Sequence, residues 1–299
     1  MSDRKQIAPS ELILNSDGSI YHLNLLPEDI SEIIINVGDP DRVSLVSSFF
    51  DEIELKKQNR EFVTHTGYYN QKRITVLSTG IGADNIDIVY NELDALVNID
   101  LKSRMINTVK KKLNLFRIGT SGSLQSSIAV DSFVCSSFGL GLDGLLNHYK
   151  FKSGENEQVL LEKIKEIFDS EQNLATPYLF PSQGDIIKEF KTVMQSGITA
   201  SCQGFYGPQG RTLRLQPAMS NLIEQLTTFK HENHRILNFE METSAMYGLA
   251  NLLGHNCCSI NLIVANRITN EFSSDPLNPM KQMIELVLDI ITQKNKGSN

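Results

Sequence analysis

An alternation of short apolar runs, glycine-bearing turns and helical patterns most restricts what this chain can fold into. Three apolar runs, at residues 32–37, 74–78 and 113–118, are each followed closely by glycine. We expect each run to be a strand that ends in a turn where glycine lets the backbone approach a ligand. Because ligands of α/β folds gather at strand ends, three such turns predict one shared site.

Helical spacing of apolar residues recurs between and after these runs, at residues 85–97, 157–168, 242–253 and 279–292. The sequence contains no internal repeat, no low-complexity tract and no Pro/Gly/Ser-rich linker. We therefore expect one α/β domain over residues 21–292. Residues 1–20 are expected to form an arm, mobile or docked on a partner, and residues 293–299 a frayed polar tail.

Charge and composition exclude several classes of protein. The 299 residues include 28 Lys and Arg against 35 Asp and Glu, a net charge of −7. This balance argues against nucleic acid as the main partner, because a phosphate-backbone binder needs a clustered basic face. No apolar run approaches the roughly 18 residues of a membrane span. The charged N-terminus lacks the apolar segment of a secretion signal.

The cysteines indicate a reducing environment. They have no CxxC spacing, and two of the four are adjacent in the sequence. We expect buried, reduced thiols in a cytoplasmic protein. The positions are Cys135, Cys202, Cys257 and Cys258.

A glycine motif at residues 139–144, GLGLDG, matches the GxGxxG pattern of dinucleotide-binding proteins. No long helix pattern opens at its third glycine, so an ordinary glycine-rich turn is the better interpretation, and a dehydrogenase is rejected.

Two segments have the chemistry of an anion site. Residues 38–42, GDPDR, follow the first strand at once, and Arg117 stands near the end of the third, before GTSG at residues 119–122. A simple turn would explain the first segment. However, an arginine near the end of an apolar strand is costly to bury without an anionic partner. The following hydroxyl and backbone N–H groups are suited to a phosphate oxygen.

Two further segments point to a nucleoside. In residues 205–211, FYGPQGR, Gln209 offers a donor and an acceptor in one plane, which suits an imide edge such as that of uracil. Arg211 can hold a carbonyl oxygen on which negative charge accumulates. Glu242 is the candidate acceptor for a sugar diol, whereas Glu240 is explained by the dipole of the helix that follows. The histidines show no metal-ligand spacing.

Taken in order, these segments resemble the uridine phosphorylases of the nucleoside phosphorylase-I superfamily, over about residues 20–290. The motifs that carry the resemblance are residues 38–42, 59–62 (NREF), 78–82 (STGIG), 117–122 (RIGTSG), 205–211, 240–242 (EME) and 266–267 (NR). Each is common alone, but seven in the family's order are a specific signal.

The resemblance implies a fold and an assembly. The fold is a single α/β domain with a central mixed sheet, partly closed into a barrel and flanked by helices. The assembly is a homo-oligomer whose active sites are shared across a dimer interface, and bacterial members favour a hexamer over a dimer. Inorganic phosphate is the implied co-substrate, and no organic cofactor is expected.

The resemblance also assigns roles to residues. The phosphate-binding positions fall on Gly38, Arg42, Arg60, Arg117 and Thr120, with Arg60 reaching over from the partner chain. The nucleoside-binding positions fall on His22, Gly122, Phe205, Gln209, Arg211, Met241 and Glu242, with His22 coming from the partner to the 5′-hydroxyl. The catalytic positions are Arg117, Gln209 and Arg211.

The sequence departs from the family in three places. Some members bind a monovalent cation such as K⁺ at positions that correspond to Glu61 and Ile81, but the third position is Asn85 here, where those members carry serine. Residues 1–20 and residues 214–235 are longer than the compact bacterial pattern.

Several alternatives stay open. The nucleoside can be uridine, deoxyuridine or thymidine. A purine nucleoside phosphorylase is the nearest rival, although the strand at residues 260–265 is followed by Asn266 rather than the purine enzymes' aspartate. A nucleosidase would leave three arginines without an anion, and a silent nucleoside-binding protein is the alternative from another class.

Overall fold

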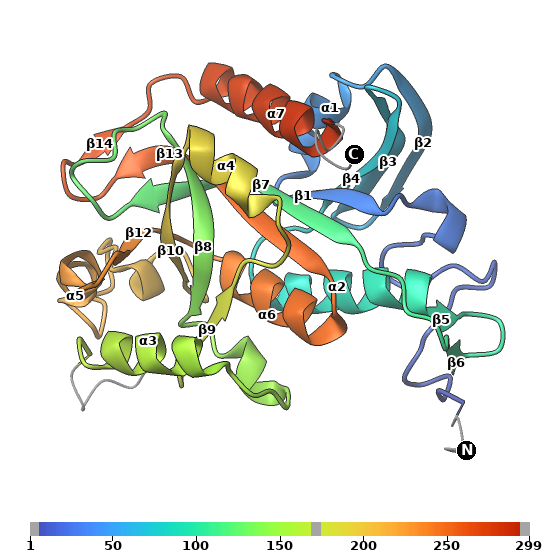
Figure 1. Cartoon of the computed structure of the whole chain (residues 1–299), viewed down its shortest axis with the longest axis horizontal. Helices are drawn as coiled ribbons and strands as arrows, with labels where there is room; N and C mark the ends of the chain where they lie inside the picture. The colour runs from blue at the N-terminus through green and yellow to red at the C-terminus, as the bar shows by residue number, and fades with distance from the viewer. Residues whose placement is uncertain (1–5, 169–174, 294–299) are drawn as a thin grey trace, which may run out of the picture.

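A large mixed sheet runs through the molecule and closes on itself at one end (Figure 1). The computed structural model describes residues 6–168 and 175–293, so the start of the expected arm and the tail from residue 294 lie outside the described residues. The strands are β1 (Ile33–Val37), β2 (Glu52–Asn59), β3 (Phe62–Tyr69), β4 (Lys72–Ser78), β5 (Ile99–Asp100), β6 (Met105–Ile106), β7 (Asn114–Ser123), β8 (Phe133–Gly141), β9 (Tyr178–Pro181), β10 (Gln195–Ser201), β11 (Lys230–His231), β12 (His234–Glu240), β13 (Asn256–Asn266) and β14 (Glu271–Phe272). The α-helices are α1 (Pro40–Ser47), α2 (Ala83–Asn98), α3 (Glu155–Lys165), α4 (Ile187–Val193), α5 (Leu222–Thr228), α6 (Thr243–Leu253) and α7 (Leu277–Thr292).

Five strands form the closed part of the sheet. They follow the order β12–β10–β8–β13–β7, and β12 then pairs antiparallel with β7 through Asn238↔Ser123 and Phe239↔Gly122. Most of these pairs are parallel, and β8 with β13 is antiparallel. The expected fold class, a mixed sheet partly closed into a barrel and flanked by helices, is confirmed.

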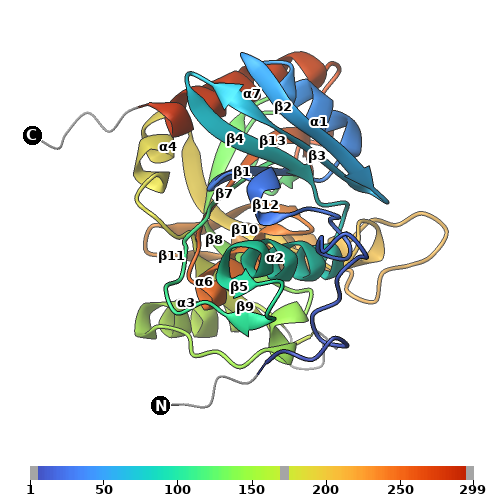
Figure 2. The ribbon, with the colours of Figure 1, turned by 90° about the vertical axis from the view of Figure 1, so that its right-hand side faces the viewer.

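The open part of the sheet extends from β7 through β1, β4, β3 and β2 (Figure 2). Strand β1 lies between β4 and β7 and is parallel to both, so the carboxyl ends of the three strands meet at one edge. The apolar side chains of β1 and β4 are almost entirely buried, as parallel strands covered on both faces require.

Helices cover the sheet on opposite sides. Helices α2 and α6 share one apolar core, and the buried face of α2 carries the predicted Ile86, Val89 and Tyr90. Helices α1 and α7 share a second core on the other side of β1 and β4, with Val43 and Ile284 at its centre. None of the helices in the described part of the chain combines the length and apolar character that crossing a bilayer requires.

Two glycine segments differ from their predictions. Residues 119–122 do not form a turn after the third strand, because β7 continues through them to Ser123 and pairs with β13. The segment 139–144 is likewise not a simple turn: Gly139 and Gly141 lie in β8, and only a short 3₁₀ helix, Leu145–His148, follows Gly144. The reason at Gly139 is close packing, because a Cβ there would lie 2.7 Å from the Ser244 Cα.

The segments beyond the family pattern are packed where they are described. In the N-terminal arm, Leu12 and Ile20 are buried in the core of α2, and the Ile7 N–H donates to the Arg104 carbonyl. Within residues 214–235, Leu222 and Leu226 of α5 are buried and β11 pairs with β12. All four cysteines are buried and free, as expected of structural thiols.

Candidate active site

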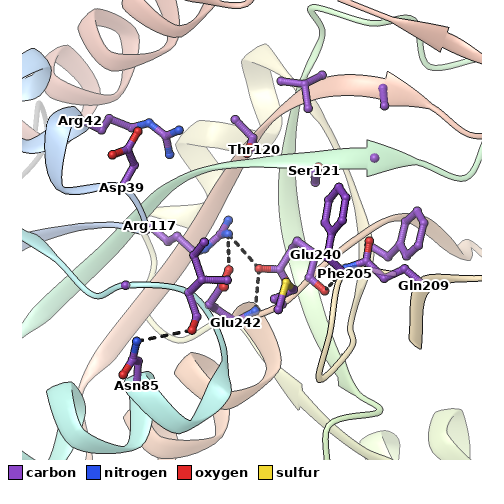
Figure 3. A pocket seen from close by; sticks show the side chains of 18 of the residues that line it. Asp39, Arg42, Asn85, Arg117, Thr120, Ser121, Phe205, Gln209, Glu240 and Glu242 are labelled. Atoms are coloured by element: carbon purple, nitrogen blue, oxygen red, sulfur yellow. Dashed lines mark hydrogen bonds and ion pairs between the residues drawn. The ribbon is translucent and has the colours of Figure 1, made fainter. Parts of the chain in front are cut away.

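The carboxyl edge of the sheet opens onto a cavity of about 630 Å³ (Figure 3). The turns after β1 and β4, the distal half of β7 and the beginning of α6 all contribute to its wall, as the strand-end argument predicts. The predicted residues that line this cavity are Gly38, Arg42, Arg117, Thr120, Gly122, Phe205, Gln209, Arg211, Met241 and Glu242. His22 and Arg60 are not among its lining residues.

Arg117 is buried at the floor of the cavity and is paired with two carboxylates. Its Nη2 lies 2.6 Å from Glu242 Oε2 and 3.1 Å from Glu240 Oε2, and Nη1 donates to Asn261 Oδ1 at 2.6 Å. Burial opposes its charge, but Glu240 and Glu242 raise the pKa of the guanidinium. The anionic partner that the sequence required is therefore present within the chain itself.

The two glutamates are held by different groups. Glu242 Oε1 accepts the Gly82 N–H at 2.8 Å, and burial raises the pKa of Glu242 although Arg117 opposes the shift. Glu240 ends β12 and accepts the Ser201 hydroxyl at 2.6 Å. It also accepts the backbone N–H groups of Glu242 and Thr243, at 3.0 Å each. Its predicted role at the helix start is thus compatible with these contacts, but the ion pair with Arg117 was missed.

Arg42 has the least satisfied charge at this end of the cavity. Its Nη1 donates to the Ile118 carbonyl at 3.4 Å, and within the described residues no carboxylate lies within 4.0 Å of it. Burial lowers the pKa of Arg42, and the nearby Arg117 lowers it further. The arginine is positioned at the start of α1, where Asp39 caps the helix by accepting the Asp41 N–H. Such a cation is suited to an incoming anion.

The other end of the cavity has a hydrogen-bonding edge and a cation. Arg211 Nη1 donates to the Gln209 Oε1 and to the Phe205 carbonyl, each at 2.6 Å. The Arg211 guanidinium also stacks 3.7 Å from the centre of the Phe205 ring. Partial burial, together with Arg267, lowers the pKa of Arg211 to about 10. Gln209 is 3% exposed, and its Nε2 donates to the Glu240 carbonyl at 3.3 Å.

His22 and Arg60 lie together outside the lining of this cavity, although Glu61, next to Arg60, belongs to that lining. The Asn59 side chain donates to the His22 carbonyl at 2.8 Å, which joins the two segments. The Arg60 guanidinium lies 5.5 Å from the centre of the Tyr21 ring, and the Tyr21 and His22 rings pack edge to face. The chain therefore does not bring these two residues to its own cavity.

The three residues at the expected positions of a monovalent-cation site lie close together. Glu61, Ile81 and Asn85 all line the cavity, but the Asn85 amide donates to the Ile81 carbonyl at 3.4 Å. That amide N–H contributes a donor where a cation needs oxygen ligands. Elsewhere in the described residues, no cluster of three or more His, Cys, Asp or Glu side chains is arranged to hold a metal ion.

Several lining residues were not identified from the sequence. They include Asp39, Glu240, Phe239, Val264, Ala265 and Phe272. Val264 and Ala265 belong to an apolar strand, and Phe239 to the strand before Glu240, so their composition predicted core positions. Only the closing of the barrel, which brings β12 beside β7, places them at the cavity.

Comparison with known proteins gives a consistent family and a divided specificity. The model of the Phosphorylase superfamily matches residues 32–291. A uridine phosphorylase from Thermococcus kodakarensis is 30% identical over 267 residues, which cover 86% of this chain and 80% of that protein. A DeoD-type purine nucleoside phosphorylase from Buchnera aphidicola is 25% identical, over 91% of this chain and 99% of that protein.

A solved structure agrees closely with the fold. It is that of a Trypanosoma brucei nucleoside phosphorylase described as showing uridine phosphorylase activity. It superposes with a TM-score of 0.85 at 27% identity, over 93% of this chain and 98% of that one.

Proposed function

The chain belongs to the Phosphorylase superfamily, and we propose that it is a uridine phosphorylase that reversibly converts uridine and phosphate to uracil and ribose 1-phosphate. The observation that carries this proposal is the order of groups along one cavity. In Figure 3, Arg42 lies at one end, Glu242 in the middle and Gln209 at the other end, and Arg211 is hydrogen-bonded to Gln209. This order corresponds to phosphate, ribose and base.

The phosphate end is assigned chiefly to Arg42. Arg117 is already shared between Glu240 and Glu242, whereas Arg42 has no ion pair with a carboxylate in the described part of the chain. Phosphate would be bound by Arg42, the Gly38 backbone and Thr120, with Arg117 below, and Arg60 of a second copy completing the set. Holding the dianion beneath C1′ is catalysis by positioning.

The base end would stabilise the departing uracil. In phosphorolysis the C1′–N bond breaks with its electron pair leaving on the base, while a phosphate oxygen bonds to C1′ from the opposite face. Positive charge develops on the sugar and negative charge on uracil. Gln209 can pair with the imide edge, and the Arg211 guanidinium can hold the carbonyl oxygen as it becomes negative. Glu242 would accept the ribose hydroxyls.

A purine substrate is less well supported, although purine phosphorylases are among the similar proteins. A purine enzyme of this superfamily places an aspartate after the strand that corresponds to β13, and here Asn266 stands there. Asn266 is 1% exposed and donates to the carbonyls of Gln125 and Ile128. Its side chain holds the backbone, and a carboxamide has no acidic proton with which to protonate a base.

We also propose a homo-oligomer of dimers, a hexamer in preference to a single dimer, with sites shared between copies. The support is the grouping of His22 and Arg60 away from the chain's own cavity, with Asn59 bonded to the His22 carbonyl. Two residues expected to act in one partner's site should lie together, and they do.

The test is nucleoside cleavage with and without inorganic phosphate, with uridine and inosine in parallel. We expect uracil release that depends on phosphate and no cleavage of inosine. Cleavage of inosine would transfer the protein to the purine enzymes, and cleavage without phosphate would make it a nucleosidase. Absence of any cleavage would favour a binding protein.

A further inference from the structure

His22 is held by a single carboxylate that the cavity does not contain. Glu92, on α2, receives the His22 backbone N–H at 3.0 Å and the Leu23 N–H at 2.8 Å. The same carboxylate lies 2.6 Å from the His22 Nδ1. One side chain therefore fixes both the backbone and the ring of this histidine.

The surroundings make this arrangement rigid. The Glu92 side chain is only 12% exposed, and the His22 side chain is 27% exposed. Leu23, the next residue, is buried in the core of α2, and Asn59 holds the His22 carbonyl from the other side. The histidine thus has its N–H, its C=O and one ring nitrogen all engaged, which leaves little freedom to its ring.

The contact with Glu92 also decides which ring nitrogen carries hydrogen. An ionised carboxylate only accepts hydrogen bonds, so a Nδ1 atom 2.6 Å away must be the donor. In the neutral imidazole a proton on Nδ1 leaves Nε2 without one, so that Nε2 becomes an acceptor. A carboxylate that sets the tautomer and orientation of a histidine in this way is a common device at functional sites.

We propose that Glu92 is a positioning residue of the active site in a neighbouring copy. It holds His22 so that Nε2 accepts the hydrogen of the nucleoside's 5′-hydroxyl. Glu92 itself does not touch the substrate. This inference rests on the proposed function and adds to it a residue that none of the sequence motifs contains.

The experiment compares uridine with 5′-deoxyuridine, which lacks only the 5′ oxygen. The measured quantity is the ratio of kcat/KM for the two nucleosides, in the full-length enzyme. We expect His22→Ala and Glu92→Ala each to lower this ratio by roughly tenfold, the typical effect of one hydrogen bond. The double variant should lower it no further, because the two residues act through one contact.

The matched control is Asp87→Ala, an acidic residue earlier on the same helix that accepts a hydrogen bond from Tyr149. Its ratio should remain that of the native enzyme. Equal losses of kcat/KM on both nucleosides in Glu92→Ala would show a merely structural role and overturn the proposal. No loss of kcat/KM on either nucleoside would overturn it as well.

A second measurement keeps the proposal testable if Glu92→Ala does not fold. Glu92→Gln has nearly the same shape. Its one oxygen should keep the backbone N–H groups of His22 and Leu23, which leaves the amide N–H facing Nδ1, so the ring proton should move to Nε2. The ¹⁵N shifts of the His22 ring, assigned by comparison with His22→Ala, report this directly. A native ring that carries its proton on Nε2 would contradict the inference.

Failure of the proposed function and failure of the Glu92 inference give different results. If the native enzyme cleaves inosine and not uridine, the same ratio is measured with inosine and 5′-deoxyinosine, since the ribose is unchanged. If it cleaves no nucleoside, the proposed function is wrong, and the substrate role of Glu92 falls with it. If cleavage occurs and the ratio falls in His22→Ala but not in Glu92→Ala, only the Glu92 inference is wrong.

Discussion

The charge of Arg117 compensates the charges of two buried carboxylates. Glu240 and Glu242 are 4% and 5% exposed, and both lie within 3.1 Å of Arg117 Nη2. Removing one partner of a buried ion pair leaves uncompensated charge, which costs more than the pair contributes. The residue thus stabilises the fold as well as the site, although its sequence position indicated only an anion ligand.

We expect Arg117→Met to lower the free energy of unfolding by about 3–5 kcal/mol. The loss should grow with pH. Burial already raises the pKa of Glu242 in the folded protein, and Arg117 is the group that opposes this shift. A carboxyl with a raised folded pKa stabilises the protein below its unfolded pKa and loses that contribution as pH rises through the folded value.

Urea unfolding at about pH 5 and about pH 7.5 measures this difference. Removal of Arg117 raises the pKa of Glu242 in the folded protein further, so the pH range between its unfolded and its folded pKa becomes wider. Lys188→Met is the control, since its pair with Asp185 is exposed. It should leave the free energy of unfolding nearly unchanged at either pH. An Arg117→Met protein equally stable at both pH values would show that the carboxylates find other partners.

Arg211 is the residue on which the leaving-group role depends. We expect Arg211→Ala to lower kcat by about 100-fold or more, the usual effect of removing one donor from a site where negative charge develops. The KM for phosphate should change little, because Arg211 lies at the opposite end of the cavity from Arg42.

Steady-state kinetics with each substrate varied gives both constants. The matched control is Arg214→Ala on the same loop, an exposed arginine that does not line this cavity. A variant of Arg211 that weakens only phosphate binding would place this arginine at the wrong end.

Local sequence patterns located the helices and strands but missed the contacts that form when the barrel closes. The apolar runs of β1 and β4 and the helical spacing of α2 and α6 were located within a few residues. The glycines of β7 were assigned to a turn because glycine is a turn signal. The pairing of β7 with β13 and β12, which keeps them in a strand, is a long-range property. Glu240 was interpreted only from its place at the start of a helix, because its ion pair with Arg117 also joins segments far apart in the sequence.

The close contact of β8 with α6 leaves no room for a side chain at Gly139. A Cβ at Gly139 would lie 2.7 Å from the Ser244 Cα and 3.0 Å from its N, and backbone of a buried helix cannot move aside cheaply. We expect Gly139→Ala to lower the free energy of unfolding by about 1–3 kcal/mol, as other overpacked sites do.

Thermal and urea unfolding measure this loss. Gly207→Ala is the control, because a Cβ there meets nothing within 4 Å. Because α6 begins directly after Glu242, the Gly139 variant should also lose activity. A Gly139→Ala protein as stable as the native one would show that the strand and helix separate easily.

At the scale of the whole molecule, the predicted site residues fall into two groups. Ten phosphate- and nucleoside-binding positions line one cavity, as do Glu61 and Ile81, whereas His22 and Arg60 lie together outside its lining, linked through Asn59. From the roles that the resemblance implies for this pair, we propose that neighbouring copies exchange it. Symmetric dimers achieve this naturally, since each copy then completes its neighbour's site.

Mixed assemblies test this exchange. We expect a chain with His22→Ala and Arg60→Ala, and a second chain with Arg211→Ala, each to be nearly inactive alone. When the two are co-expressed with different tags and purified through both, one site per mixed dimer combines an intact cavity with an intact His22 and Arg60. The mixed dimer should recover roughly half of the native kcat. Mixing His22→Ala with Arg60→Ala chains is the control, because every shared site then lacks one of the two ligands. No recovery in the test pair would mean that each chain uses its own two residues.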